Sequence, residues 1–502
     1  MDRPPELPIT DEDWTHTPPA VRVVVVVLGQ QVQALQGQVQ ALQGQVPPLQ
    51  QQVEDLQAEV AKLRERLGQN SRNSSRPPSQ DPPATPPRPP RPATGRRRGG
   101  QPGHRGHGRT PQPAGAVQRV VPVRPDTCAT CGALLLGADP QPVCHQVTEL
   151  PPVQPVVVEY QRHTLTCLAC GTANQAPWPV AMPPGSFGPR AQATVGYLSG
   201  RLGLSQRDVQ ETMAALFHLA LGLGTVPAVE QQVSAALAHP VQAAQTYVRQ
   251  QPVNNVDETS WRESRVRIWL WINTTPAVTV FTLLAGRGAA QARQVLGADF
   301  AGIVGSDRYA AYNWLDPRRR ALCWAHLERD FQALGERGGE SARVGQALLE
   351  QSGQMFHRWY QVKAGTLSRA DFQTQMAPIR TRVGALLRAG ALVTHDKTRH
   401  TCANILKLEP ALWTFVFVEG VEPTNNGAER PLRRAVLWRR KSFGTQSAAG
   451  SRFVERVLTA VTTLRQQRRD VLDYLTAACE ASVQGLTSPS LLPVSPPGGA
   501  IA

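Results

Sequence analysis

The stretch PVNNVDETSWRESRVRIWLWINTTPAVTVFTLLAG (252–286) decides the fold of the largest domain. Its apolar residues alternate with polar ones or form short continuous runs, which is the pattern of β-strands. We expect a short first strand that ends in two acids, Asp257 and Glu258. The segments 265–273 and 277–286 then follow as antiparallel strands.

The next segments extend this sheet. A helix is expected at about 288–297, and GIVGSDRYAAYN (302–313) is a further apolar strand that ends at Asp307. ALCWAHLERDF (321–331) begins as a strand and becomes a helix. This order matches an RNase H-like sheet, in which acids at the ends of the first and fourth strands lie side by side.

A third acid stands in TNNGAERPLRRAVLWRRK (424–441), where Glu429 is followed by six basic residues. Two Mg²⁺ ions about 4 Å apart can activate a nucleophile and neutralise a leaving oxygen in phosphodiester chemistry, and they require carboxylate ligands. Asp257, Asp307 and Glu429 are the candidate catalytic residues and magnesium ligands. Taken singly, each acid has a simpler interpretation as a loop, helix-cap or surface ion-pair residue. Asn425 and Asn426 are positioned to cap or brace the helix start.

The composition and net charge of the chain limit which classes of partner it can bind. The chain has 502 residues and a formal net charge of +15, with arginine in excess over lysine, which favours phosphate binding. No apolar run approaches the roughly 20 residues of a membrane span, and the N-terminus lacks a signal-peptide layout. We therefore expect a cytoplasmic, nucleoid-associated protein without a membrane partner. Eight cysteines do not indicate a disulfide scaffold.

A heptad pattern follows a leader at 1–29. QVQALQG occurs at 31–37 and again at 38–44. Valines occupy one position of five heptads and leucines the position three residues later: Val32, Val39, Val46, Val53, Val60, Leu35, Leu42, Leu49, Leu56 and Leu63. This predicts a parallel two-stranded coiled coil over 30–69 and hence a homo-oligomer. Pro47-Pro48 predicts a kinked or two-piece coil. The alternative is an amphipathic helix packed on the protein's own core.

A proline- and arginine-rich linker is expected at 70–125, because this segment has few apolar residues. It carries eleven arginines and one acid between Arg72 and Arg124. GRRRGGQPGHRGHGR (95–109) resembles a minor-groove arm. Its candidate DNA-binding residues are Arg96, Arg97, Arg98 and Arg105. A solvated tether is the alternative.

Two cysteine motifs, CATCG (128–132) and CLACG (167–171), predict a zinc-ribbon-like domain at 126–180. The expected ligands of one structural Zn²⁺ are Cys128, Cys131, Cys167 and Cys170. Cys144 and His145 lie between the motifs as alternative ligands, and a redox pair is a further alternative.

A helical domain that binds DNA is expected at 186–245. One helix runs from about Pro189 to Leu202, and Ser205 caps a second helix that bears Arg207. The spacing fits a helix-turn-helix that binds DNA through Arg207, or a simple helical hairpin.

Several motifs together resemble the IS66 family of bacterial insertion-sequence transposases. They are D-E-T-x-W (257–261), S-D-x-Y-x-A-Y (306–312), C-W-A-H-x-x-R (323–329), N-N-x-A-E-R (425–430), R-R-K-S-F-G (439–444), N-S-S-R-P-P-S (73–79) and G-G-Q-P-G-H-R-G-H (99–107). The resemblance covers about residues 50 to 480. It implies a DDE transposase with an RNase H-like core, a zinc-finger segment and a leucine-zipper-like N-terminus. Carried over by position, the triad is Asp257, Asp307 and Glu429.

The same resemblance implies a multidomain α/β chain. The catalytic domain would span 250–445 with a helical insertion at about 326–420, before a helical segment at 446–485 and a disordered tail at 486–502. Two positions depart from the family pattern. Arg308 stands where glycine is expected, and Pro431 predicts that the helix carrying Glu429 begins late or is kinked.

The leading interpretation is a transposase that nicks element ends and joins them to target DNA. Its expected partners are the terminal inverted repeats, target DNA and companion proteins of the element. Candidate DNA contacts are His326, Arg329, Arg430, Arg433, Arg434, Arg439, Arg440 and Lys441. For Cys323 and His326 a structural or phosphate-contacting role is favoured over metal ligation, and Trp261 and Trp324 are expected in the core. Alternatives are a catalytically decayed DNA-binding protein and a coiled-coil scaffold.

Overall fold

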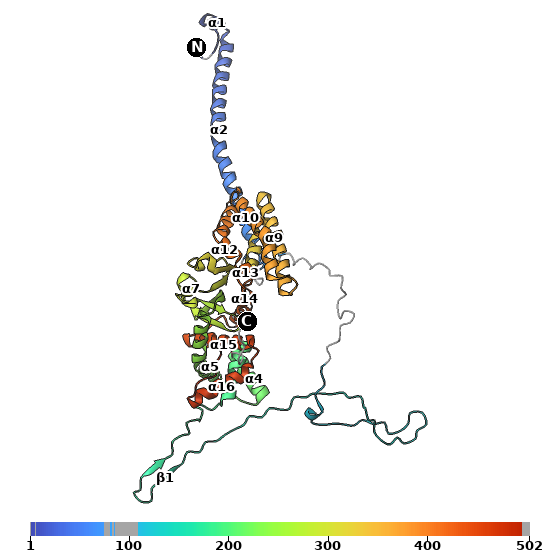
Figure 1. Cartoon of the computed structure of the whole chain (residues 1–502). Coiled ribbons are helices and arrows are strands. Elements are labelled where there is room, and N and C mark those ends of the chain that lie inside the picture. The colour runs from blue at the N-terminus through green and yellow to red at the C-terminus, as the bar shows by residue number, and fades with distance from the viewer. Residues whose placement is uncertain (1, 6, 75–80, 83–84, 86–108, 494–502) are drawn as a thin grey trace.

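The computed structural model describes residues 2–5, 7–74, 81–82, 85 and 109–493 (Figure 1). A mixed body of helices and one five-stranded sheet carries a long N-terminal helix at one end, and an extended segment leaves it at the other. The arginine-rich arm with Arg96, Arg97, Arg98 and Arg105 lies outside the described residues. Among the described helices, none is both long and apolar enough to cross a bilayer.

The sheet has the order β5-β4-β3-β6-β7. Its strands are β3 (Val253–Glu263), β4 (Val266–Thr274), β5 (Thr279–Leu284), β6 (Ile303–Ser306) and β7 (Arg320–Leu322). The first three pair antiparallel, as the sequence predicts, and β6 and β7 add in parallel. The expectation that the first strand ends at its two acids is wrong. Pairing with β4 continues to Glu263, so Asp257 and Glu258 lie in the middle of β3.

Helices cover both faces of the sheet. On one face α7 (Ala289–Leu296) packs its Leu296 against Val256 and Trp271. On the other face α14 (Asn426–Ser442) and α15 (Ala448–Gln466) pack against the strands, with Leu432 and Val454 in one cluster with Trp261. Side chains alternate across a strand, so Asp257 shares the α14 face with Trp261.

Between β7 and α14 the chain forms a helical body. Its elements are α8 (Trp324–Gly335), α9 (Gly339–Lys363), α10 (Arg369–Gly390), α11 (Asp396–Leu406), α12 (Glu409–Leu412) and α13 (Thr414–Phe417). Phe331, Trp359, Phe372 and Phe415 are buried together in its core. Trp324 and Trp261 are fully buried, which confirms their expected core positions.

A second helical layer packs against the far side of α15. It contains α3 (Pro189–Tyr197), the π-helical turn η3 (Leu198–Leu202), α4 (Gln206–Phe217), α5 (Thr225–Ala236), α6 (Ala238–Arg249) and α16 (Val471–Gln484). Ser205 caps α4 through a capping box, as expected. Gly200 allows η3 to approach α15, because a Cβ there would lie 2.1 Å from a methyl carbon of Val457. Leu491 is buried in this core, so the expected disordered tail does not begin at residue 486.

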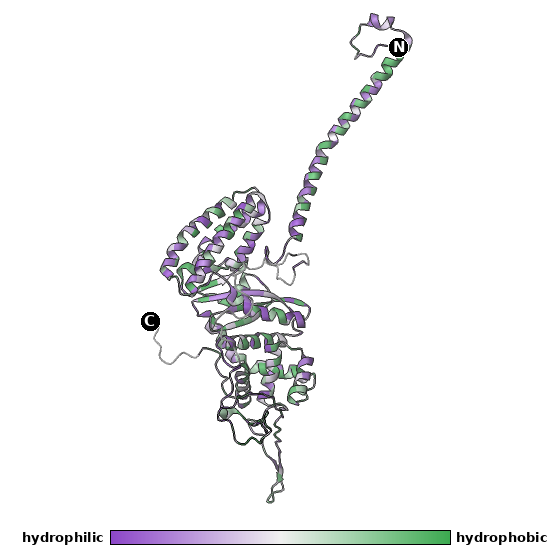
Figure 2. Cartoon of the chain, turned by 90° about the vertical axis from the view of Figure 1, so that its right-hand side faces the viewer, coloured by the Kyte–Doolittle hydropathy of each residue, from purple (hydrophilic) through white to green (hydrophobic). Residues whose placement is uncertain are grey.

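The N-terminal elements are α1 (Asp11–His16) and α2 (Pro19–Leu67), and α2 projects from the body (Figures 1 and 2). Pro47 and Pro48 lie inside this single helix, so the expected break into two pieces does not occur. All side chains of α2 are described and none is buried, which rules out packing on the protein's own core in this structure. Its C-terminal end is anchored, because Glu65 pairs with Arg337 at 3.2 Å and with Lys397.

Candidate active site

Strand register places the first two acids next to each other. Asn255 of β3 pairs with Gly305 of β6. Two residues further along the chain are Asp257, still in β3, and Asp307, the first residue after β6. A Cβ at Gly305 would lie 2.0 Å from Oδ1 of Asn255, so a larger residue there would have to displace the Asn255 side chain. Both carboxylates are half-buried at the edge where the parallel strands end.

The start of α14 brings Glu429 to the same edge. The Asn425 side chain is buried and donates from Nδ2 to the Val256 carbonyl at 2.7 Å. Its backbone N–H donates to the Cys323 sulfur at 3.2 Å. Asn425 therefore braces the helix start without capping it through its side chain. The helix begins five residues before Pro431, so the expected late start is wrong.

The electrostatics link the three acids. Asp257 is only partly exposed to water, and the protein around its carboxylate disfavours the charged form. This desolvation is the largest cause that raises the pKa of Asp257 well above its ordinary value. The negative charges of Glu258, Asp307 and Glu429 raise the pKa of Asp257 further, against a hydrogen bond from the Glu258 N–H. Such a group of acids favours the binding of a proton or a cation at Asp257.

Glu258 is a buried carboxylate that sequence reasoning assigned no role. It accepts from Arg287 Nε at 2.7 Å and from the Tyr312 hydroxyl at 2.6 Å. Burial is the largest cause that raises its pKa, and Asp307 adds to it. Alternation along β3 turns Glu258 to the α7 face and away from Asp257, which separates the adjacent acids.

Two arginines fix the segment that carries Asp307. Arg320 is fully buried and donates to the Asp307 carbonyl at 3.1 Å and to Asn313 Oδ1 at 3.0 Å. Burial lowers the pKa of Arg320 to about 10. Arg308 donates through Nε and Nη2 to Asp330, at 3.0 and 2.6 Å. The arginine at the expected glycine position therefore ties the turn after β6 to α8.

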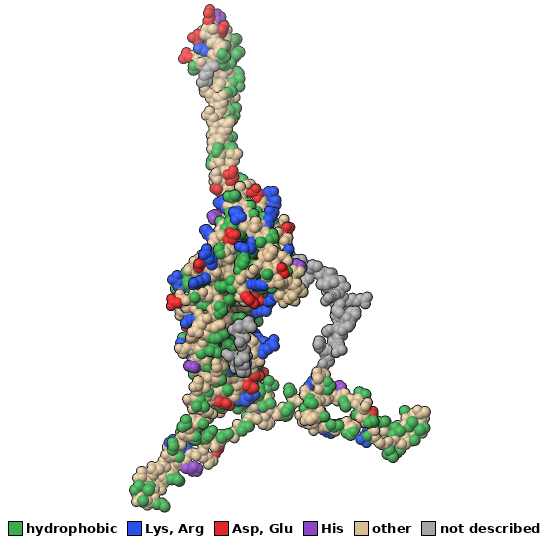
Figure 3. Space-filling view, in the orientation of Figure 1, with side chains coloured by type: hydrophobic (Ala, Val, Ile, Leu, Met, Phe, Trp, Pro, Cys, Tyr) green, Lys and Arg blue, Asp and Glu red, His purple; other side chains and the backbone are tan. Residues whose placement is uncertain are grey.

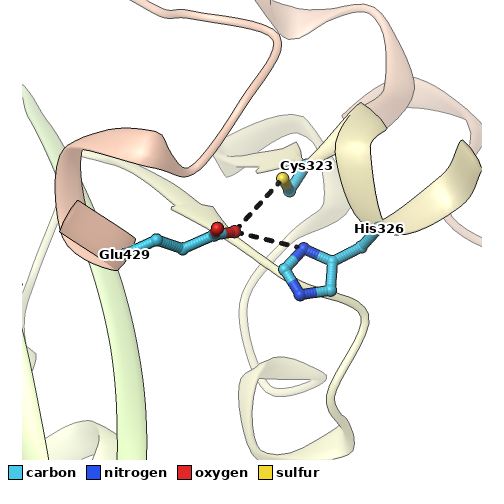
Figure 4. Close-up of side chains that lie close together, drawn as sticks. All are labelled: Cys323, His326 and Glu429. Carbon is cyan, nitrogen blue, oxygen red and sulfur yellow. Dashed lines mark hydrogen bonds and ion pairs between the residues drawn. The ribbon is translucent and has the colours of Figure 1, made fainter. Parts of the chain in front are cut away.

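Cys323 and His326 lie beside Glu429 (Figure 4). Glu429 Oε1 is 3.9 Å from Cys323 Sγ and 3.5 Å from His326 Nδ1. Their ligating atoms all lie within 4.8 Å of one another. Burial, and then the Glu429 charge, raise the pKa of the Cys323 thiol to about 12, so sulfur stays protonated. Burial and Arg329 lower the pKa of His326, which favours neutral imidazole beside Glu429.

Two cavities flank α14. One of about 420 Å³ is lined by Gly200, Arg201, Leu202, Gly203, Arg430, Arg433, Arg434, Leu437, Trp438 and Lys441. The other, of about 470 Å³, is lined by Ser260, Trp261, Arg262, Arg267, Arg439, Arg440 and Phe443. The predicted basic residues of α14 therefore divide between two separate sites. Arg207 is exposed on α4 and Arg329 is half-buried on α8. Positive side chains are spread over the body, whereas most of α2 carries few (Figure 3).

The two cysteine motifs form matching turns. In each, the first cysteine N–H bonds to the carbonyl five residues on, and the glycine N–H bonds back to that cysteine. Gly132 and Gly171 both have φ of +73°, which favours glycine. Backbone hydrogen bonding from Cys131 lowers the pKa of Cys128, and a hydrogen bond with Thr172 lowers the pKa of Cys170. Within the described residues, the four knuckle cysteines do not converge on one point.

The segment between the knuckles differs from expectation. The stretch VVVEYQRHTLTC (156–167), whose β-branched and aromatic residues predict a strand leading into the second knuckle, forms only the short β1 (Thr164–Thr166), which pairs with β2 (Ala173–Gln175) around that knuckle. Val143, Val156 and Val157 are almost fully exposed. An apolar segment without a core is typical of small domains that fold on their metal.

Comparison with known proteins defines the class. Residues 125–171 match the zinc-finger binding domain of transposase IS66, and residues 185–452 match the transposase IS66 family. Both domains are ones that IS66 transposases carry, and the first of them is a zinc finger. Because the second match covers more than half of its length, the protein belongs to the IS66 transposase family. Residues 18–110 match a further family, of unknown function.

Two relatives come from Sinorhizobium fredii. The uncharacterized protein y4qI is 28% identical over 246 residues, which is 44% of each chain. The uncharacterized protein y4hP is 24% identical over 384 residues, which is 69% of each chain. This chain thus matches less than half the length of y4qI and about two thirds of y4hP.

Proposed function

We propose that this protein is an active DNA transposase, which cleaves the ends of its element and transfers them to target DNA. The observation that carries the proposal is the convergence of Asp257, Asp307 and Glu429 at one edge of the sheet. The strand order, with β3 central and β6 and β7 parallel to it, supports an RNase H-like core over 250–445.

The three acids fit divalent magnesium. They are hard oxygen ligands from three separate segments of the chain. Burial first, and then repulsion from neighbouring acids that include Asp307 and Glu429, raises the pKa of Asp257, and a bound cation would relieve that repulsion. Asp257, Asp307 and Glu429 would hold two Mg²⁺. The ions would supply an activated oxygen nucleophile and neutralise the leaving oxygen.

The surrounding residues position the acids and the DNA. Arg320 and Arg308 fix the segment of Asp307, and Asn425 fixes the first turn of α14. His326 lies beside Glu429, where it can orient the carboxylate or contact phosphate together with Arg329. The basic side chains of α14 would bind backbone phosphates on either side of the scissile bond.

The zinc ribbon would add DNA affinity from 126–180. Cys128, Cys131, Cys167 and Cys170 are thiolate donors of the kind that tetrahedral Zn²⁺ prefers, in two preformed turns. Metal binding would draw the two turns together. The arginines of 70–125 and Arg207 in 186–245 would contribute further phosphate contacts.

Pairing of two element ends requires more than one subunit. The exposed valine and leucine stripe of α2 fits a second copy of the helix, as a parallel coiled coil over 30–69. The proposed chain also contains the leader 1–29, the insertion at about 326–420 and the helical segment 446–485. Action on chromosomal DNA places the protein at the nucleoid, with companion proteins of its element as candidate partners.

Strand cleavage in vitro tests this proposal. Full-length protein with Mg²⁺ should cut or join DNA that carries the inverted repeats flanking its gene. Asp257→Asn should abolish the reaction and keep DNA binding, whereas Asp299→Asn, at an exposed acid between α7 and β6, should remain active. Binding without strand transfer under any divalent metal would instead support the decayed DNA-binding protein.

A further inference from the structure

The cavity at the C-terminal end of α14 is larger than a phosphate site needs. Its volume is about 470 Å³, and Trp261 of β3 contributes to its wall. Exposed guanidinium groups of Arg262 and Arg267 line it together with the exposed ring of Phe443. Of the lining residues, all of which are described, none is acidic.

Phe443 is held outward by a rigid turn. Its φ is +59°, in the left-handed region that bulky residues rarely adopt, and its ring is 78% exposed. Gly444 follows with φ of +113°, and a Cβ there would lie 2.2 Å from the Arg262 carbonyl oxygen. That same carbonyl accepts from the Thr445 N–H at 2.9 Å. Both the strained backbone and the exposed apolar ring reduce the stability of the fold, which points to a role of Phe443 in binding a ligand.

Arg439 ties the end of α14 to β3. Its Nη1 donates to Ser260 Oγ at 2.8 Å and to Thr259 Oγ1 at 3.0 Å, and it also contacts the Ser260 carbonyl. The cavity wall is therefore fixed on two elements that also carry Asp257 and Glu429. A rigid aromatic ring with guanidinium groups around it suits a π-faced, anionic ligand.

The cavity lies at a defined distance from the acids. Trp261 is four residues beyond Asp257 on β3, about 13 Å at the usual strand rise. Arg440 is eleven residues beyond Glu429 on α14, about 16 Å along the helix. Stacked nucleotides are spaced by about 3.4 Å, so the cavity is about four nucleotides from the cleavage position.

We propose that this cavity receives one unpaired nucleobase of the element end, which stacks on Phe443 while Arg262 and Arg267 bind its flanking phosphates. The inference rests on the proposed function and adds a feature to it: the duplex is opened about four nucleotides from the cut. An unpaired base that leaves the duplex loses its stacking on the neighbouring bases and gains stacking on the Phe443 ring. Because every base has a π-face, this stabilisation does not depend on which base is opened. Trp261 and Trp324 are fully buried and do not offer such a ring.

The test compares two DNA duplexes in buffer without Mg²⁺, where no cleavage is expected and, in contrast to a chelator, the zinc finger keeps its metal. One is fully paired, and the other has the same sequence with one unpaired thymidine. Contributions of the zinc finger and the arginine-rich arm are common to both, so the ratio of affinities reports the cavity. Wild-type protein should prefer the duplex with the unpaired base by about 5- to 150-fold, the range that one stacked base contributes.

Variants assign that preference to the ring. Phe443→Asn should remove the preference and keep the affinity for paired DNA, because asparagine tolerates left-handed backbone. Phe443→Trp should retain it, and Tyr360→Ala, which removes an exposed ring on α9, should leave it unchanged.

Three outcomes would overturn the inference: equal binding of both duplexes by wild type, an unchanged preference in Phe443→Asn, or loss of binding to both duplexes in that variant. Failure of the proposed function is a separate observation, since it is the absence of metal-dependent cleavage by wild-type protein.

Discussion

Glu455 on α15 makes the stability of the fold depend on pH. Its Oε1 accepts from the Leu283 N–H of β5 at 2.5 Å, where the helix packs on the sheet. Burial is the largest cause that raises the pKa of Glu455, from 4.5 to about 7. The Leu283 hydrogen bond and the charges of Arg456 and Arg452 oppose this rise in pKa, and Glu263 adds to it.

Because the pKa of Glu455 is raised in the folded chain, its titration lowers the stability of the fold as pH rises. Below about pH 4.5 this carboxyl is protonated in both the folded and the unfolded chain, so it contributes no pH dependence. As pH rises from about 4.5 to about 7, the unfolded chain releases its proton first and folding becomes less favourable. The rise of about 2.5 pKa units corresponds to at most about 3 kcal/mol, which is fully expressed above pH 7.

Glu455→Gln removes this titration and keeps a carbonyl oxygen for the Leu283 N–H. We expect the variant to be more stable than wild type by up to about 3 kcal/mol at pH 8.5, and by under about 1 kcal/mol at pH 5. Urea unfolding followed by tryptophan fluorescence measures this, because Trp261 and Trp271 are buried in the sheet. Glu480→Gln, at an exposed glutamate of α16, is the control. A stability difference that does not change with pH would refute the reasoning.

Three further predictions concern the acids, the zinc and the coil. Asp257→Asn should raise the melting temperature in EDTA at pH 8. The pKa of Asp257 is raised in the folded chain, so at a pH above the pKa of an unfolded aspartate its carboxyl group destabilises the fold, and asparagine removes that cost. In scanning fluorimetry with saturating Mg²⁺, wild-type protein should instead melt at the higher temperature of the two. If the variant melts at a lower temperature than wild type in EDTA, the charged form of Asp257 does not destabilise the metal-free fold. Cys128→Ser should reduce bound zinc from about one per chain to almost none by elemental analysis, since three thiolates hold Zn²⁺ less well than four; an unchanged zinc content would exclude this cysteine as a ligand. Leu42→Glu should convert the oligomer to monomer in light scattering, because two glutamate side chains would face each other in the apolar layer where Leu42 of one helix meets Leu42 of the other. An unchanged mass would assign oligomerisation to another surface.

The sheet was predictable where the signal was local. The alternation of apolar residues placed Asp257 on a strand and Asp307 at the end of another, and these two strands are neighbours in the sheet. The heptads indicated the long helix, and the cysteine spacing indicated the knuckles. The extent of β3 was not predictable in this way, because it depends on pairing between Glu263 and Val266 across a turn. Polar residues after Asp257 hid that continuation.

Contacts between distant segments account for most of what sequence reasoning missed. Asn425 reaches Val256 across 169 positions and so sets where Glu429 lies. The burial of Arg320 and Glu258 depends on partners from other loops, such as Asn313 and Tyr312. Nothing in the local pattern around these charges distinguishes them from surface residues. The left-handed backbone of Phe443 is likewise imposed by a turn bonded to β3.

Helix α14 also has a mechanical consequence. Its seventeen residues form a rod about 25 Å long, with Glu429 in its first turn and Arg439 and Arg440 near its far end. A rod transmits displacement along its axis, so tension on DNA held at the far end would act on the carboxylate at the near end. The mechanical load on a bound strand and the geometry of the acids are thereby joined through a single element.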